Sequence, residues 1–217
     1  MPNTDHAFSI AAADAEVEDL IIELPRLWWM FSIRSLMTLT FSGICFFVSS
    51  TMATILLRPA GFVLLQMLFS FYVIATGFIL LTGALYAFDT NLRHRYVLLA
   101  DSLINVAIGL VFFVTLHISM QGILTLFALH AAAIGVFYLL ISLRMRKQLV
   151  SRILVDVAGA ISLGAGVRFF LRRGEAMHVM TSEIAVYSAL LGVVLLVFSI
   201  TQRTHRQDQR RLAAAKV

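Results

Sequence analysis

Long apolar runs, separated by short polar segments, dominate the pattern of hydrophobic and polar positions along the chain. A helix needs about 20 residues to cross the roughly 30 Å of hydrocarbon in a bilayer, and the runs are close to this length or longer. The predicted spans are residues 28–51, 60–88, 96–116, 120–142, 150–170 and 182–200. Trp28 and Trp29 open the first span, where tryptophan is typical of the membrane interface. We therefore predict an all-α, polytopic membrane bundle of six transmembrane helices.

Polar segments flank the predicted membrane domain, which covers residues 27–201. Residues 1–26 are read as a cytoplasmic segment in which residues 7–24 form a short amphipathic helix, although a partly ordered tail fits equally well. Residues 202–217 are read as a basic cytoplasmic tail. The first 24 residues carry six acids and no Lys or Arg. A signal peptide begins with a basic segment, so no cleavable signal peptide is expected.

The composition favours lipid as the surrounding medium. Hydrophobic residues make up 60% of the chain and charged residues only 13%, whereas a soluble domain has about 45–50% and 25%. The formal net charge is +5, and the basic residues fall between the apolar runs. This placement indicates contact with a membrane surface rather than with nucleic acid. Cys45 is the single cysteine, which excludes an intramolecular disulfide and a site built from several thiolates.

The basic residues also predict how the chain is oriented. With both termini in the cytoplasm, twelve lie inside, four lie outside and Arg34 lies within the first span. The inside residues are Arg26, Arg93, Arg95, Arg144, Arg146, Lys147, Arg152, Arg203, Arg206, Arg210, Arg211 and Lys216, and the outside residues are Arg58, Arg168, Arg172 and Arg173. This excess of positive charge inside favours cytoplasmic termini. The opposite orientation stays open because three outside arginines cluster in the last loop.

Two residue spacings recur three times and predict an internal repeat. In the first, third and fifth spans a charged residue is followed eight positions later by a small one. These pairs are Arg34 and Ser42, Asp101 and Gly109, and Asp156 and Gly164. In the other spans an aromatic residue or histidine precedes a glycine by five positions. These pairs are Tyr72 and Gly77, His130 and Gly135, and Tyr187 and Gly192. We therefore predict three parallel helical hairpins, with the small residues at helix contacts.

The hairpin pattern resembles the HdeD family of small bacterial membrane proteins, over residues 28–201. In that family the odd helices often carry a charged or small residue with a glycine eight positions on, and the even helices carry a tyrosine about five residues before a glycine. Ser42 stands here for the first glycine and His130 for the second tyrosine. The resemblance implies an association with acid-stress resistance. It supplies no established catalytic residue.

Charged residues inside the predicted spans are the sharpest candidate site. Arg34, Asp101 and Asp156 lie about 8–9 Å into their helices from one side of the membrane, at about 1.5 Å per residue. A lone charge at the bilayer centre costs roughly 2.5–3.5 kcal/mol, so we predict that the three meet in one layer. One of two carboxyls beside a single arginine would keep its proton, which makes the layer a candidate protonation-sensitive element. The alternative is an Arg–Asp pair with the other Asp hydrated at the interface.

Other polar residues carry weaker signals. His130 is the histidine that lies within a span, and we interpret it as structural, with neither a metal nor another cofactor predicted. Glu175, His178 and Glu183 follow the fifth span, where ion pairs with Arg172 and Arg173 are expected to be exposed and weak. No nucleotide-binding loop, nucleophile elbow or zinc-protease motif occurs in the sequence.

The sequence therefore predicts a multi-pass protein of the bacterial inner membrane without enzymatic chemistry, related to stress or acid resistance. The alternative function is a small transporter or channel component whose path is lined by the charge layer. The lipid bilayer is the expected partner, a second copy or another membrane protein is left open, and no nucleic acid is expected.

Overall fold

The computed structural model describes residues 28–51, 58–86, 92–114, 119–143 and 149–214. The helix predicted over residues 7–24 lies outside these ranges. Each regular element within them is an α-helix. The helices are α2 (Trp28–Thr51), α3 (Arg58–Tyr86), α4 (Leu92–Val114), α5 (Met120–Ser142), α6 (Leu149–Leu171) and α7 (Met177–Ala214). The all-α prediction is confirmed for the described part of the chain.

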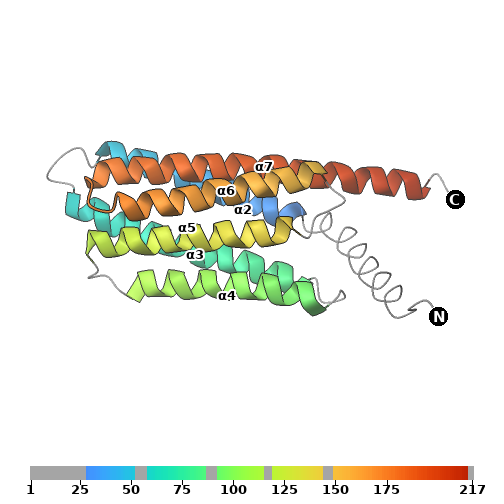
Figure 1. Cartoon of the computed structure of the whole chain (residues 1–217), viewed down its shortest axis with the longest axis horizontal. Coiled ribbons are helices and arrows are strands. Elements are labelled where there is room, and N and C mark those ends of the chain that lie inside the picture. The colour runs from blue at the N-terminus through green and yellow to red at the C-terminus, as the bar shows by residue number, and fades with distance from the viewer. Residues whose placement is uncertain (1–27, 52–57, 87–91, 115–118, 144–148, 215–217) are drawn as a thin grey trace, which may run out of the picture.

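The helices are arranged as a bundle with their axes close to one direction (Figure 1). Successive helices run in opposite directions, so α2, α4 and α6 point one way and α3, α5 and α7 the other. The most extensive helix contacts are those of α2 with α7, α3 with α4, and α5 with α6. The first and last described helices therefore pack together and close the bundle.

The distribution of side chains is that of a protein embedded in lipid. Large apolar side chains such as Leu36 and Phe47 are exposed, whereas Arg34, Asp101 and Asn105 are buried. Water would favour the reverse arrangement, but hydrocarbon surrounds apolar groups without penalty and makes exposed polar groups costly. The bundle is thus consistent with an integral membrane protein that contacts lipid.

Five described helical segments are long and apolar enough to cross a membrane. They are Trp28–Ser50, Val63–Leu85, Gln121–Ser142, Leu149–Leu171 and His178–Gln207. In α4 the apolar part is Leu98–Val114, which is shorter. The five segments indicate a multi-pass membrane protein.

Local contacts explain how α5 begins and how the turn between α6 and α7 closes. Ser119 precedes α5, and its hydroxyl accepts a hydrogen bond from the backbone N–H of Gly122 at 3.3 Å. Serine is favoured at this position because its side chain satisfies a backbone donor that the helix leaves free. Between α6 and α7 the backbone N–H of Glu175 donates to the carbonyl of Arg172 at 3.0 Å, which closes a short turn.

Helix α7 is longer than the hydrophobic pattern predicted. The expected span of residues 182–200 continues as helix to Ala214, through residues assigned to a separate basic tail. This part projects past the other described helices in Figure 1. Its Gln, Arg and Ala residues are good helix formers, so the helix does not end where the apolar run ends. Arg203 lies over the ring of Trp28, 5.1 Å from its centroid.

Candidate functional site: a buried charge pair

Two of the three predicted intramembrane charges meet in the centre of the bundle. Arg34 of α2 and Asp101 of α4 form an ion pair, with Nη1 and Oδ2 3.7 Å apart. Arg34 is 1% exposed and Asp101 is 4% exposed. Their side chains therefore lie inside the protein, where each charge compensates the other rather than facing lipid.

The side chains one helical turn along α2 and α4 support this pair. The Asn105 amide donates to the Asp101 carboxylate Oδ1 at 2.8 Å and to the Asp101 carbonyl at 2.7 Å. On α2, the Thr38 hydroxyl donates to the Arg34 carbonyl at 2.7 Å and lies 3.0 Å from the hydroxyl of Tyr72. Thr38 and Asn105 are thus buried beside the charged residue of their own helix.

Tyr138 completes the surroundings of the pair, and sequence reasoning did not single it out. The Arg34 guanidinium carbon lies 5.4 Å from the centroid of the Tyr138 ring. A cation is attracted to the face of an aromatic ring within about 6 Å. Tyr138 lies eight residues after His130, on nearly the same face of α5, and this spacing was the available signal.

Asp156 does not join the pair. Its side chain is 44% exposed, and its Oδ2 lies 3.8 Å from Nε of Arg152 on the same helix. Its other oxygen accepts a hydrogen bond from Ser142. The predicted three-charge layer is thus corrected to a two-charge pair. Asp156 lies toward the periphery because the buried face of α6 carries Val155, Ala158, Gly159 and Ser162 instead.

The aromatic and histidine positions of the predicted repeat lie near the core. Tyr72 stacks on Phe41 with ring centroids 4.7 Å apart. Tyr187 donates its hydroxyl to Ser162 at 3.3 Å. His130 is buried, with its ring edge-on to Phe69 at 5.4 Å. Within the described ranges, no three His, Cys, Asp or Glu side chains are grouped as metal ligands would be.

Four predicted glycines lie where two helix backbones come close. A Cβ at Gly77 would lie 3.1 Å from the Ser102 carbonyl, and one at Gly135 would lie 2.9 Å from the Gly159 carbonyl. A Cβ at Gly109 would lie 3.0 Å from the backbone nitrogen of Ile74 in α3, and one at Gly192 would lie 2.8 Å from the Leu39 side chain and 3.3 Å from the Leu39 nitrogen in α2. Only glycine fits such approaches without displacing a neighbour.

Gly164 was predicted to pack in the same way, and this prediction is wrong. Nothing in the described residues lies within 4 Å of a Cβ at that position. Gly166, two residues later on α6, is in close contact with α5 instead. Its Cβ would lie 2.9 Å from the carbonyl of Ala128 and 3.0 Å from the backbone nitrogen of Ala132.

Serine hydroxyls reinforce these close contacts between helices. Ser35 donates to the carbonyl of Gly192 at 2.8 Å, and Ser102 donates to that of Gly77 at the same distance. Ser42 donates to the carbonyl of Ala185 at 2.7 Å. Each bond joins α2 to α7 or α4 to α3. Because lipid gives no hydrophobic driving force between helices, such hydrogen bonds help to hold them together.

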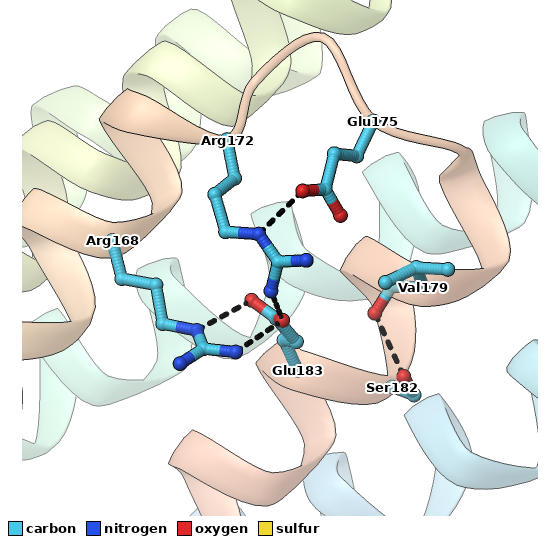
Figure 2. A network of polar contacts seen from close by, with 6 residues as sticks. All are labelled: Arg168, Arg172, Glu175, Val179, Ser182 and Glu183. Atoms are coloured by element: carbon cyan, nitrogen blue, oxygen red, sulfur yellow. Dashed lines mark hydrogen bonds and ion pairs between the residues drawn. The ribbon is translucent and has the colours of Figure 1, made fainter.

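A second polar network lies at the α6–α7 turn (Figure 2). Glu183 of α7 accepts two hydrogen bonds from Arg168, at 3.0 and 2.7 Å, and one from Arg172. Arg172 also donates to Glu175 at 2.5 Å. Figure 2 shows both arginines pointing toward Glu183. Two cations thus share one carboxylate and link the end of α6 to the start of α7.

Comparisons of the chain with protein-family models, with curated proteins and with solved structures found no match.

Proposed function

We propose that the chain is a six-span protein of the bacterial inner membrane, built from three helical hairpins and acting in stress or acid resistance. Its role would depend on a packed bundle and contacts with partners rather than on chemical transformation of a substrate. The observation that carries the proposal is the Arg34–Asp101 pair, enclosed by the bundle at 1% and 4% exposure. A charge pair that stabilises helix packing needs this enclosure, whereas a transport path needs access from one side.

Contacts at matched spacing support the three-hairpin repeat. Gly77, Gly135 and Gly192 each approach the next hairpin in cyclic order, through α4, α6 and α2 respectively. Ser102 O and Val106 N lie beside Gly77, and Gly159 O and Leu163 N lie beside Gly135, four residues apart in both cases.

These contacts change the alignment of the third hairpin by two residues. Gly159 lies opposite Gly135 as Ser102 lies opposite Gly77. Ala158, which precedes Gly159, therefore occupies the place that Asp101 has before Ser102. Eight residues after Ala158 comes Gly166, which contacts α5 as Gly109 contacts α3. The repeat is therefore proposed with Ala158 and Gly166 in place of Asp156 and Gly164.

The length of α4 supports a sixth crossing. The helix has 23 residues, which corresponds to about 34 Å at 1.5 Å per residue. It packs along α3 and runs parallel to the bundle axis in Figure 1. The basic residues at its start, Arg93 and Arg95, fit the cytoplasmic end of a span.

The association with acid resistance rests on the resemblance to the HdeD family at Arg34, Asp101 and the tyrosine–glycine spacings. A deletion strain tests it by survival across external pH, with complementation by the wild type, Asp101→Asn and Asp156→Asn. We expect wild type and Asp156→Asn to restore survival in acid and Asp101→Asn to fail. Equal survival of the deletion and parent strains at every pH would contradict the proposed role.

Flux measurements separate this proposal from transport. Purified protein in liposomes should leave proton and ion permeability at the level of empty liposomes. A flux that Asp101→Asn abolishes would favour the transporter or channel component instead.

A further inference from the structure

Several buried polar atoms lie around the charge pair without a hydrogen-bond partner among the described protein groups. Arg34 Nε and Nη2, Asp101 Oδ2, Asn105 Oδ1 and the Tyr138 hydroxyl are all buried, and none has a hydrogen-bond partner in the described part of the chain. They come from α2, α4 and α5, and they lie around the Arg34–Asp101 ion pair.

Leaving these atoms unsatisfied would be costly. A buried donor or acceptor without a partner costs about 1–3 kcal/mol, and more when it is charged. Hydrocarbon around the bundle cannot supply the missing bonds. Several such atoms around one ion pair therefore point to small polar ligands that supply the missing hydrogen bonds.

The balance of charge and of hydrogen-bonding groups decides the class of ligand. Arg34 and Asp101 together are neutral, so a bound anion or cation would leave a net charge buried in a low-dielectric interior. The unsatisfied groups include donors on Arg34 and Tyr138 and acceptors on Asp101 and Asn105. A ligand that both accepts and donates in a small volume fits this set, and water does so with two donors and two acceptors.

The geometry of the ion pair agrees with this assignment. Nη1 of Arg34 and Oδ2 of Asp101 are 3.7 Å apart, whereas direct charge-assisted hydrogen bonds are about 2.7–2.9 Å. Polar groups at such a separation are commonly joined through a water molecule. Buried waters typically make about three hydrogen bonds to otherwise unsatisfied groups.

We propose that the centre of the bundle is a binding site for ordered water, which bridges Arg34 of α2, Asp101 and Asn105 of α4, and Tyr138 of α5. The water joins three helices at the level of the Arg34–Asp101 pair. The site does not depend on the cellular role proposed above, because it follows from the packing alone.

Solid-state NMR of the full chain in lipid bilayers tests the site. Arg34 is the only arginine that follows an isoleucine, so labelling with carbonyl-¹³C isoleucine and ¹⁵N arginine identifies its backbone, and through-bond transfer reaches its Nε. We expect magnetisation from water protons to reach Nε of Arg34 at mixing times at which it reaches the exposed Arg168. Absence of this transfer at Arg34 in folded protein, with transfer at Arg168 intact, would overturn the proposal.

Two tyrosine variants provide a matched comparison. Tyr138→Phe removes a hydroxyl assigned to the water and should reduce the transfer to Arg34 Nε. Tyr72→Phe removes a hydroxyl that already lies 3.0 Å from Thr38, and should leave the transfer unchanged. Equal effects of both variants would count against the site.

Exchange of chloride for gluconate distinguishes water from a bound anion. The Nε chemical shift of Arg34 should stay constant. A shift that follows chloride concentration would identify an anion as the ligand and overturn the assignment to water.

Discussion

Removal of one charge of the buried pair should destabilise the bundle far more than removal of the peripheral carboxylate. Asp101→Asn and Asp156→Asn are the same chemical change at two places that the sequence treats alike. In Asp101→Asn the Arg34 guanidinium, 1% exposed, loses the carboxylate 3.7 Å away. An uncompensated charge in the bilayer costs roughly 2.5–3.5 kcal/mol, and breaking a buried pair costs about 3–5 kcal/mol.

A cost of about 3 kcal/mol corresponds to a change of roughly 100-fold in the unfolding equilibrium, at 1.36 kcal/mol per factor of ten. Asp156 is 44% exposed and faces Arg152 at i−4. Exposed pairs of this kind contribute about 0.3–0.5 kcal/mol. The asparagine at 156 also keeps an oxygen that can accept from Ser142. We therefore expect Asp101→Asn to lower the free energy of unfolding several-fold more than Asp156→Asn does.

Reversible unfolding in mixed micelles, with increasing SDS and followed by far-UV circular dichroism, measures both variants. The double variant Arg34→Met/Asp101→Asn serves as the control and should regain most of the lost stability, because it leaves no unpaired charge. Asp101→Asn as stable as wild type would refute the reasoning, and so would an equal loss in Asp156→Asn.

Two further predictions concern packing and the α6–α7 turn. Gly135→Ala places a methyl group against the backbone of α6 and should cost about 1–3 kcal/mol in the same SDS titration. Gly164→Ala has open space and should be neutral or slightly stabilising, because alanine is the better helix former; equal effects would contradict the close approach at Gly135. Glu183→Gln removes the carboxylate shared by two arginines and should increase proteolysis at the turn more than Glu175→Gln, which releases one contact; the reverse order would contradict the shared arrangement.

The helices themselves could be predicted from the chain because apolar length is a strong signal in a membrane protein. The end of α7 could not, because the apolar run ends near residue 200 while the helix continues to Ala214. A helix does not need apolar residues to continue, and the arginines and glutamines of this segment have high helix propensity.

The candidate site could be predicted in part. Arg34 and Asp101 could be predicted because a charge in an apolar run needs a partner. The carboxylate partner of Arg34 was correctly expected on another helix that runs in the same direction, which is α4. Asp156 satisfied the same rule but lies two residues before the buried Ala158. Two residues rotate a helix by about 200°, so a small error in alignment moves a side chain to the opposite face. Spacing alone cannot choose between these alignments, and the contacts of Gly135 with Gly159 and Leu163 are the reason for the alignment proposed above.

The proposed bundle of six membrane crossings predicts that both ends of the chain lie on one side of the membrane. Epitope tags at both termini, and single cysteines from Ser119→Cys and Gly174→Cys in a Cys45→Ala background, report on this in right-side-out and inverted vesicles. We predict that both tags are reached from the cytoplasmic side and that an impermeant maleimide labels both cysteines from the opposite side. Tags on opposite sides would show an odd number of crossings and contradict the six-span bundle.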